Sequence, residues 1–419
     1  MTTEEPQPGQ ASTPEPEPPA TGLNRRHLFG YAGAAGVGAL AGFGAGRVSA
    51  PVAPSGSTSG EVTRQTHSPH GVHQAGIVTR TPAVTRLLAF NLLGADVEAL
   101  KKLLQLWSGD IPALMAGKPI PGDPTPELAQ AGVSLSITVG LGPKVFSLPG
   151  LTRKRPDGFV EIPAMRHDQL QGRWSGGDLL AIVAADDATT VDYAARRLTR
   201  DAGTFAELAW VQDGSWRGVD ASGAPVTGRN LFGQVDGSGN PSGEVLDATV
   251  WAADPLPWFV GGTTFVVRRI EMDLDFWDRT TRDRQEKVIG RRLDNGAPLT
   301  GHQETDALDL AATDADGRPL IPTDAHARRS HPDENASRRI LRRGINYTHT
   351  EMVDDRPVAT AGLIFQSFQA NIAQQFVPIQ NRLDENDALN DWTHAIGSAV
   401  FALPGGFAEG DWIARALFE

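Results

Sequence analysis

The chain has 419 residues, 40% of them hydrophobic and 21% charged, which is typical of a globular protein with one large core or two packed domains. Its net charge of −12 provides no broad attraction for nucleic acid or an anionic membrane, which argues against nucleic-acid partners. The absence of cysteine excludes disulfides, iron–sulfur clusters, thiolate-ligated haem and covalently attached haem. Any metal must therefore be held by histidine or oxygen ligands.

The first 50 residues have the organisation of an export signal. Residues 1–23 are rich in Pro, Glu, Thr and Gln without hydrophobic periodicity, which predicts a disordered leader. Arg25 and Arg26 then precede a Gly/Ala-rich apolar run over 30–46, and the small residues of 47–50 are typical of a cleavage site. This order resembles a twin-arginine signal. The alternatives are a Sec signal or a membrane helix, but a run with seven glycines falls short of the roughly 20 apolar residues that a membrane helix needs.

A twin-arginine signal also carries information about the protein that follows it. The twin-arginine translocase exports folded proteins, typically those that receive a cofactor before export. We therefore expect a secreted, cell-envelope or periplasmic location, no stable membrane anchor, and a cofactor held by histidine. Residues 51–67 are rich in Ser, Thr, Gly and Pro, which predicts a flexible tether before the folded domain.

Strand and helix patterns alternate along the rest of the chain. Short apolar or alternating runs predict strands over 75–79, 86–92, 133–140, 178–184, 206–212, 262–271, 361–368 and 397–403. Helical periodicity predicts helices over 95–116, 187–201 and 372–383. Strands separated by helices, with some strands adjacent in sequence, favour an α+β fold.

The order strand–helix–strand–strand–helix–strand can be drawn twice, over 72–215 and again over 255–410. This repetition predicts two ferredoxin-like halves, an N-terminal half over 68–225 and a C-terminal half over 226–419. Residues 278–345 are rich in Arg, Asp, Gly and Pro and have no regular strand pattern. They predict a long insertion in the C-terminal half, and insertions of that length are often functional.

Three segments carry side chains suited to acid–base or metal chemistry, although each has a simpler interpretation by itself. Residues 233–241 (GQVDGSGNP) hold Asp236 in a run that is typical of a turn. Residues 324–328 (DAHAR) hold His326, and a lone histidine is more often structural than a ligand. Residues 339–347 (RILRRGINY) form a basic cluster, which is usually a solvated helix end or a salt-bridged face.

Taken together, the order and spacing of these segments resemble the dye-decolourising (DyP-type) haem peroxidases, in their twin-arginine-exported A-type subgroup. Residues 71–77 (GVHQAGI) resemble the first-strand motif of that subgroup, and residues 362–369 (GLIFQSFQ) resemble the strand that lines the distal haem face. The resemblance covers residues 70–410. It implies the fold called a dimeric α+β barrel, in which two ferredoxin-like halves of one chain form the barrel, with one haem b per chain in the C-terminal half. Whether two chains form a homodimer is left open by the resemblance.

The resemblance also implies which residues lie on the distal side of the haem, where peroxide reacts. Asp236 matches the distal acid and Arg342 the distal arginine, so these two are the expected catalytic pair. Gly237, beside that acid, and Phe365, on the lining strand, are expected to contact the cofactor.

On the proximal side, the resemblance makes His326 the iron ligand. Arg328 is expected to contact a haem propionate, because a guanidinium fits a carboxylate with two hydrogen bonds. Asp387 is the candidate carboxylate that orients His326, and an ordinary surface aspartate is an equal alternative. The chain departs from the family pattern at Ala327 and at His331, and His331 is a rival ligand.

Other histidines suggest a different metal site. His67, His70 and His73 are spaced three apart, as ligands on one turn could be. They lie beside the predicted tether, which favours a structural or incidental role.

The chemistry of peroxide reduction requires the same residue types. Peroxide must bind ferric iron, lose a proton and break its O–O bond to give a ferryl intermediate, which calls for an imidazole ligand, a proton shuttle and a cation. The expected function is oxidation of dyes, phenols or other reductants by hydrogen peroxide. The alternatives are an exported haem-binding protein of the deferrochelatase type, which releases iron from haem, and a ferredoxin-like interaction module without haem.

Large dyes cannot enter a buried haem pocket, so an aromatic side chain near the surface is expected to carry their electrons. The chain has nine Trp and three Tyr, most of which must simply pack in the core. Tyr347, close to Arg342, and Trp392, close to Asp387, are the predicted candidates.

Overall fold

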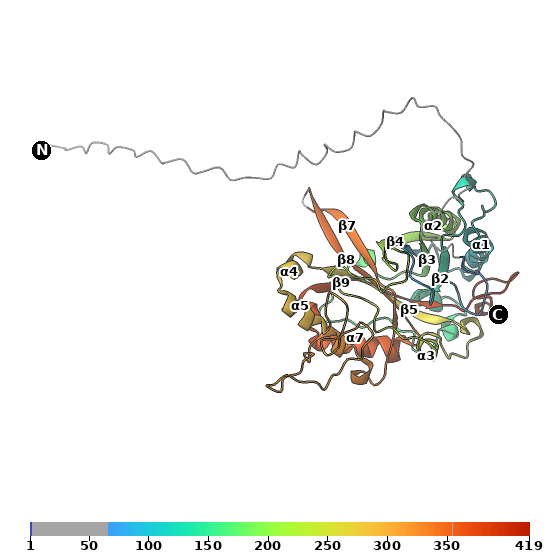
Figure 1. Ribbon diagram of the computed structural model, residues 1–419. Coiled ribbons are helices and arrows are strands. Elements are labelled where there is room, and N and C mark those ends of the chain that lie inside the picture. The colour runs from blue at the N-terminus through green and yellow to red at the C-terminus, as the bar shows by residue number, and fades with distance from the viewer. Residues whose placement is uncertain (2–65, 354) are drawn as a thin grey trace, which may run out of the picture. The chain divides into compact units, whose positions relative to one another are not determined.

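The computed structural model describes residues 66–353 and 355–419, together with Met1, all but Met1 within the unit Thr58–Glu419. Apart from Met1, the predicted signal over 1–50 therefore lies outside the described residues, as does nearly all of the predicted tether over 51–67. The described part is built around an antiparallel barrel with helices on its outside (Figure 1). None of its helices is long and apolar enough to cross a membrane.

The N-terminal half folds as a ferredoxin-like unit. In chain order it comprises β1 (Val84–Leu92), α1 (Val97–Met115), β2 (Ser136–Leu141), β3 (Leu179–Ala185), α2 (Ala188–Ala202) and β4 (Ala206–Ser215). Its four strands are antiparallel in the order β2-β3-β1-β4. Strands β2 and β4, the second and fourth in chain order, therefore lie on the two sides of this four-stranded sheet. Two interleaved strand–helix–strand units give this order.

The C-terminal half repeats this topology. Its strands are β5 (Thr263–Met272), β7 (Ile345–Val353), β8 (Arg356–Gln369) and β9 (Thr393–Leu403), in the order β9-β5-β8-β7, with α7 (Val377–Asn386) between β8 and β9. Residues 273–344 occupy the position of the first helix. This segment contains α4 (Leu274–Arg279), α5 (Arg282–Ile289), α6 (His326–Arg329) and the two-residue strand β6 (Leu341–Arg342), while α3 (Glu244–Val250) precedes β5.

Shorter helical turns complete the described secondary structure. The 3-10 helices are Pro126–Leu128, Pro143–Ser147, Thr152–Lys154, Gly172–Trp174, Pro257–Phe259, Pro332–Glu334, Ala388–Asp391 and Arg415–Leu417, and a π-helix over Ile372–Phe376 leads into α7.

The two sheets close into one barrel through narrow seams. Leu141 of β2 pairs with Ala402 of β9, and Ser215 of β4 pairs with Asn346 of β7. The ninth strand, β6, pairs only with β8, beyond the point where the pairing of β7 with β8 ends. The shared interior is apolar and draws on both halves, with Leu87, Ala89, Phe265, Ile364 and Phe401 among its buried side chains.

Helices α1 and α2 cover the outer face of the N-terminal sheet. Asp96 and Asp187 begin them by accepting hydrogen bonds from the main chain of the first turn. The buried residues of α1 recur at helical spacing on one side, over Leu100, Leu103, Leu104, Trp107 and Ile111. The indole of Trp107 donates to the Leu198 carbonyl of α2 at 3.1 Å. This face of the barrel is therefore filled by apolar side chains.

The predicted α+β class with two ferredoxin-like halves is confirmed, whereas two local predictions are wrong. Residues 75–79 form turns instead of a strand, because Gly76 adopts φ +92° and lies against Thr138 of β2. Strand β7 was also not predicted, and it begins at the last residue of the predicted insertion over 278–345. That segment otherwise contains α5, α6 and β6.

A pair of carboxyl groups, Asp110 buried and Asp201 half-buried, lies between α1 and α2 and affects the stability of the fold. Asp110 and Asp201 face each other across the two helices, and burial and then the Asp110 charge raise the pKa of Asp201 to about 7, against the opposing charges of Arg197 and Arg200. A folded-state pKa above the ordinary value of 3.8 stabilises the fold at acidic pH, and that stabilisation is lost as pH rises through about 7.

Asp201→Asn should therefore raise the melting temperature at pH 8 by roughly 2–4 °C and change it little at pH 4, because the amide stays neutral and can still donate to Asp110. Thermal melting followed by circular dichroism at both pH values measures the effect. Asp278→Asn, at an exposed carboxylate of α4, is the matched control. Equal shifts at pH 4 and pH 8 would contradict the assignment of the raised pKa.

Candidate active site

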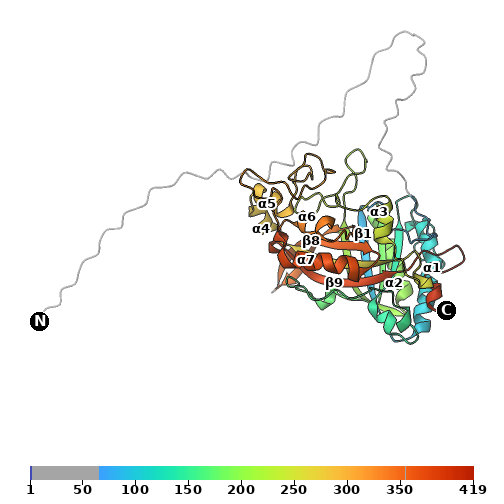
Figure 2. The same ribbon diagram turned by 90° about the horizontal axis from the view of Figure 1, so that it is seen from below.

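A cavity lies against the outer face of the C-terminal sheet and is lined in part by α7. Helix α7 is labelled in Figure 2. The cavity contains about 1490 Å³ of space not filled by atoms, its open mouth included. Alternate residues of β5 and β8 line it, and α7 adds three more: Arg268, Ile270, Met272, Leu363, Phe365, Ile379, Gln380 and Leu383. Because neighbouring side chains of a strand point to opposite faces, the intervening Val267 and Ile364 fill the barrel interior.

His326 and Asp387 form a hydrogen-bonded pair in the wall of this cavity. His326 is the first residue of α6, and its Nδ1 lies 2.6 Å from Oδ2 of Asp387, directly after α7. The other Asp387 oxygen accepts the Leu389 main-chain N–H at 2.9 Å, which fixes the carboxylate. Since an ionised carboxylate only accepts, Nδ1 carries the proton and Nε2 keeps the lone pair that a metal would bind.

Electrostatics at this pair favour an electron-rich imidazole. Burial lowers the pKa of His326, but the charge of Asp387 and its hydrogen bond raise it by more, so that the pKa lies above its ordinary value. A carboxylate partner of this kind makes a histidine a stronger donor to a metal.

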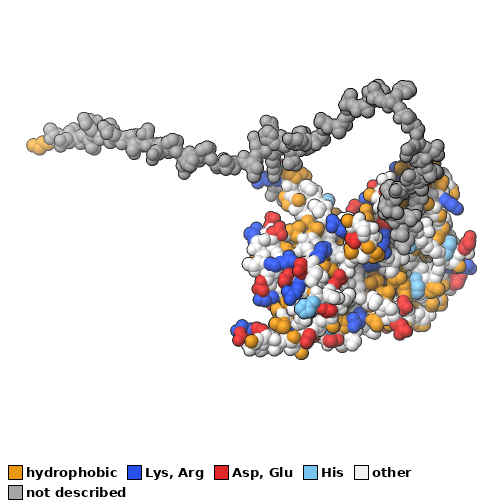
Figure 3. Space-filling view, viewed as in Figure 1, with side chains coloured by type: hydrophobic (Ala, Val, Ile, Leu, Met, Phe, Trp, Pro, Cys, Tyr) orange, Lys and Arg blue, Asp and Glu red, His pale blue; other side chains and the backbone are white. Residues whose placement is uncertain are grey.

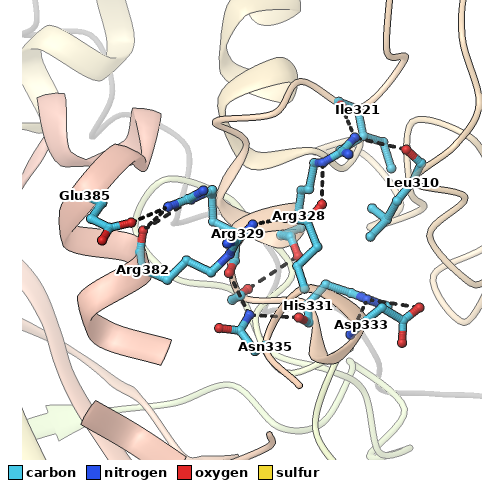
Figure 4. A network of polar contacts seen from close by, with 12 residues as sticks. Leu310, Ile321, Arg328, Arg329, His331, Asp333, Asn335, Arg382 and Glu385 are labelled. Atoms are coloured by element: carbon cyan, nitrogen blue, oxygen red, sulfur yellow. Dashed lines mark hydrogen bonds and ion pairs between the residues drawn. The ribbon is translucent and has the colours of Figure 1, made fainter. Parts of the chain in front are cut away.

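Helix α6, which carries His326, is hydrogen-bonded to α7 through Arg329 and Arg382, which are labelled in Figure 4. Arg329 donates from Nη2 to the Arg382 carbonyl at 2.6 Å, and the amide of Asn335 donates to the Arg329 carbonyl at 2.8 Å. These contacts hold the four-residue helix α6 in place although it is too short to be stable by itself.

Asp236 and Arg342 meet in the same cavity. Arg342 donates from Nη1 to Oδ1 of Asp236 at 2.8 Å, and both side chains are largely buried. The main-chain N–H of Asp236 donates to the Gly228 carbonyl at 2.9 Å, and Asn230 approaches its second oxygen at 3.4 Å. Arg342 and Asn230 thus hold the carboxylate of Asp236, while the Gly228 carbonyl holds its main chain.

The main chain of Arg342 is clamped by one side chain. The Arg342 N–H donates to Oδ1 of Asn240 at 3.0 Å, and Nδ2 of Asn240 donates to the Arg342 carbonyl at 2.8 Å. Arg342 also pairs with Ser367 of β8. Asn240 lies in the predicted turn segment over 233–241, where no sequence pattern indicates this role.

The structure brings five of the seven predicted site residues to one cavity: Asp236, His326, Arg342, Phe365 and Asp387. Gly237 instead lines a smaller neighbouring cavity, which also touches Asp236 and Arg342. Its φ of +134° is a backbone conformation that favours glycine, so it shapes the turn after Asp236.

Arg328 does not reach the main cavity. It donates from Nε to Glu334 at 2.8 Å and from Nη1 to the carbonyls of Leu310 and Ile321 (Figure 4). These bonds engage its guanidinium with the loop, and a contact of Arg328 with a haem propionate stays a prediction. Arginines that do line the cavity, besides Arg342, are Arg268, Arg291, Arg338 and Arg339. Of these four, only Arg339 belongs to the basic cluster over 339–347 that the sequence indicated.

His331 also lines the cavity, but its surroundings differ from those of His326. Its Nδ1 accepts the Asp333 main-chain N–H at 3.3 Å and caps the 3-10 helix that follows. Burial lowers the pKa of His331 below its ordinary value. With Nδ1 accepting and no buried carboxylate to orient the ring, His331 is less well arranged as a ligand.

The three N-terminal histidines have separate surroundings. His73 stacks on Trp251 with ring centres 3.5 Å apart, and His70 packs edge-on against Phe407 at 5.0 Å. Among the described residues, no three His, Asp or Glu side chains gather as a metal site. The aromatic contacts give His70 and His73 structural surroundings.

The residues of the main cavity fit a haem. Phe365, Leu363, Met272, Phe376 and Ile379 provide the apolar walls that a porphyrin ring needs, and His326 offers a free Nε2. Arg291, Arg338 and Arg339 supply cations suited to propionates. Burial and the charge of Arg342 lower the pKa of Arg291, which a bound carboxylate would offset.

Comparison with known proteins identifies the family. The model of the Dyp-type peroxidase N-terminal domain matches residues 74–216, and that of the C-terminal domain matches residues 227–408. The chain belongs to the DyP-type peroxidase family. It is therefore a haem peroxidase by family, and members bind haem, as a DypB variant from Rhodococcus jostii solved in complex with heme illustrates.

Individual DyP-type relatives match along most of their length. A dye-decolorizing peroxidase from Thermobifida fusca is 34% identical over 97% of this chain and 99% of that protein. A deferrochelatase from Escherichia coli K12 is 30% identical over 87% of this chain and 90% of that protein. The crystal structure of a DyP-type peroxidase from Cellulomonas bogoriensis is 40% identical, covers 85% of this chain and 99% of that chain, and superimposes with a TM-score of 0.81.

His326→Ala should abolish stable haem binding, because His326 alone combines a free Nε2 with a buried carboxylate partner in this cavity. Asp387→Asn should retain haem with an affinity about 10–100-fold lower, the usual effect of losing such a partner. Soret absorbance and iron content of the purified variants measure both effects. His331→Ala is the comparison variant, and loss of haem there with retention in His326→Ala would transfer the ligand role to His331.

Proposed function

We propose that this DyP-type peroxidase binds one haem b per chain in the cavity of the C-terminal half, with His326 as the iron ligand and Asp236 and Arg342 as the catalytic pair. The observation that carries the proposal is the meeting of two side-chain pairs in one cavity. The His326–Asp387 pair suits a metal ligand, and the Asp236–Arg342 pair suits peroxide chemistry.

The roles of the catalytic pair follow from the electrons and protons that peroxide reduction requires. Reduction of hydrogen peroxide to two waters takes up two electrons and two protons. Bound haem supplies the redox-active iron. Asp236 accepts the proton from one peroxide oxygen and delivers it to the other, which leaves as water. Arg342 stabilises the negative charge that develops as the O–O bond breaks, and it holds the Asp236 carboxylate in place. Small phenols or other reductants then supply the electrons, one at a time.

A spectroscopic experiment tests this function. Purified protein loaded with haem should show a Soret band that changes on mixing with hydrogen peroxide and returns when a phenol or dye is added. The E. coli relative named a deferrochelatase motivates the second candidate, iron release from haem. Metal-free porphyrin, detected by its fluorescence after incubation with a reductant, would favour that candidate, whereas dye turnover without porphyrin supports the peroxidase.

We also propose that the chain is an A-type member exported through the twin-arginine pathway to a secreted, cell-envelope or periplasmic location. Arg25-Arg26 and the small-residue site over 47–50 support this proposal. Replacing both arginines with lysine should leave the haem-loaded protein inside the cell. Continued export of that variant would contradict the pathway. A homodimer stays a proposal that sedimentation of the haem-loaded protein can test.

Losing Arg342 should slow the reaction with peroxide at least as much as losing Asp236. Water can replace part of the proton transfer, but it is a poor substitute for a fixed cation. Arg342→Leu should therefore lower the second-order rate constant about 10²–10³-fold, and Asp236→Ala by a similar or smaller factor.

Stopped-flow mixing of haem-loaded variants with peroxide measures both constants. Haem content, determined before each experiment, is the control for a lost cofactor. A clearly faster reaction in Arg342→Leu than in Asp236→Ala would reverse the order and make proton transfer the dominant contribution.

Trp392 lies between the cavity wall and the surface. It is 3% exposed and stacks on Phe276 with ring centres 5.3 Å apart, and Phe276 is 42% exposed. Trp277 packs edge-on against Trp392 at 5.5 Å. The same apolar cluster contains Leu363 and Leu389, which line the cavity. An electron from a dye at Phe276 therefore has a short path of aromatic and apolar groups to the haem site.

Tyr347, the other predicted candidate, has less suitable surroundings. The guanidinium of Arg269 lies 3.8 Å from its ring centre, and a cation at that position makes the ring harder to oxidise. Burial raises the pKa of Tyr347 to about 12, and its hydroxyl has no hydrogen-bond partner among the described residues. A tyrosine must release its proton on oxidation, and no described residue accepts it at Tyr347. The indole nitrogen of Trp392 also has no partner among the described residues, but a tryptophan can be oxidised to a radical cation without releasing its proton.

Trp392→Phe should lower turnover of a bulky dye several-fold while leaving the reaction with peroxide unchanged, because only the path of the electrons is altered. Tyr347→Phe is the matched control and should leave both rates unchanged. Steady-state dye oxidation and the protein-radical signal after peroxide addition measure the outcome. If dye turnover depends on Tyr347 instead, the electrons pass through the barrel interior.

A further inference from the structure

Arg343, next to the proposed catalytic arginine, is a buried cation with unusual partners. It is 9% exposed, and among residues 66–353 and 355–419 no carboxylate contributes to the shift of its pKa. Its guanidinium donates to three main-chain carbonyls, those of Ile77 at 3.0 Å, Thr79, and Arg80 at 3.3 Å. Burial and the charge of Arg80 lower the pKa of Arg343 to about 10, so it remains a cation at neutral pH.

The main chain of Arg343 is held from the opposite direction by β8. Its N–H donates to the Gln366 carbonyl at 2.9 Å, and the Gln366 side chain donates back to the Arg343 carbonyl at 3.0 Å. Arg343 therefore connects β8 to residues 77–80, the segment that leads into the N-terminal half. Gly344 follows it and lies so close to Leu363 that a side chain there would crowd the cavity wall.

We propose that Arg343 is a positioning residue for Arg342, through which the N-terminal segment 77–80 sets the geometry of the Asp236–Arg342 pair. Consecutive Cα atoms are fixed about 3.8 Å apart, so a shift of Arg343 is passed to the main chain of Arg342. Asn240 clamps Arg342 on its other side. Arg342 thus aims at Asp236 from a backbone held at both ends. This inference rests on the proposed roles of Asp236 and Arg342.

Arginine suits this position better than any other residue. A guanidinium presents five N–H donors in a rigid plane and so reaches several carbonyls at once, whereas a lysine ammonium is a compact charge on a flexible chain. Without the guanidinium, the carbonyls of Ile77, Thr79 and Arg80 lose a shared donor, and the segment that carries them is free to separate from β8.

Arg343→Lys and Arg343→Met test the proposal in haem-loaded protein. A displacement of about 1 Å at a catalytic group can slow a reaction by about 10²-fold. Arg343→Met should therefore lower the rate constant for peroxide about 10–100-fold, and Arg343→Lys should recover part of it. Haem content and the rate of the reductant step should stay unchanged. Arg155→Met, which removes an arginine-to-carbonyl bond from the Phe159 loop, is the matched control.

Two further measurements separate positioning from general destabilisation. All rates are taken per haem-loaded molecule, well below the melting temperature, where a purely structural role does not move them. Asn240→Ala alone should also slow the peroxide reaction, and combined with Arg343→Lys it should cost less than the product of the two single effects, because both act through Arg342. This cycle relies on the milder lysine variant and remains informative where Arg343→Met does not fold.

The outcomes distinguish this inference from the proposed function. If Arg342→Leu and Asp236→Ala react with peroxide as the wild type does, the proposed catalytic pair is wrong. If those variants are slow but Arg343→Lys and Arg343→Met react at the wild-type rate, only the positioning role of Arg343 is overturned. Strictly additive effects of Asn240→Ala and Arg343→Lys would also overturn it.

Discussion

Strands β5 and β8 must supply side chains to both faces of the C-terminal sheet, and the rest of the structure depends on this constraint. One set of alternating residues, including Val267 and Ile364, must fill the barrel interior that both halves share. The other set, including Arg268 and Phe365, is left for the outer face. On the N-terminal sheet α1 and α2 cover that outer face with apolar side chains, whereas on the C-terminal sheet residues 273–344 replace one helix and a cavity results. The site therefore exists because one repeat of the fold lacks its first helix.

The same replacement explains why the chemical groups come from short, irregular elements. His326 lies on a helix of four residues and Arg342 on a strand of two, neither of which is stable in isolation. Each is fixed by side-chain bonds, such as those of Asn335 and Asn240, instead of by regular secondary structure. The face of the molecule seen in Figure 3 carries interspersed acidic, basic and apolar side chains. Because charges of both signs are mixed on this face, they produce no field of one sign that would attract a large charged partner.

Much of the fold could be predicted because its signals are local. The spacing of apolar residues predicted α1 and α2, and alternation predicted β1, β3, β5 and β9. The strand prediction over 75–79 was wrong because an apolar run can also lie in turns along a strand edge. The preceding residue, Gln74, bonds the main chain of Val139 there. Strand β7 was not predicted because its outer part, with Thr348, His349, Thr350 and Met352 exposed, has little apolar alternation. With β8 it forms a projecting hairpin (Figure 1).

The site residues divide in the same way. Asp236, His326 and Arg342 stand in recognisable segments, but the direction of a long side chain is decided by partners distant in sequence. Arg328 donates to the carbonyls of Leu310 and Ile321, and no sequence pattern around Arg328 predicts these partners.

Arg268 lies in an apolar strand and pairs with Asp168 of the N-terminal half, although one nitrogen and one oxygen of this buried pair have no partner among the described residues. Because apolar residues at such positions are often equally stabilising or more so, stability alone does not explain why the charges are kept in this wall. The charge arrangement at the cavity is thus a property of the assembled barrel, to which the N-terminal half contributes through Asp168 as it does through the carbonyls that bind Arg343.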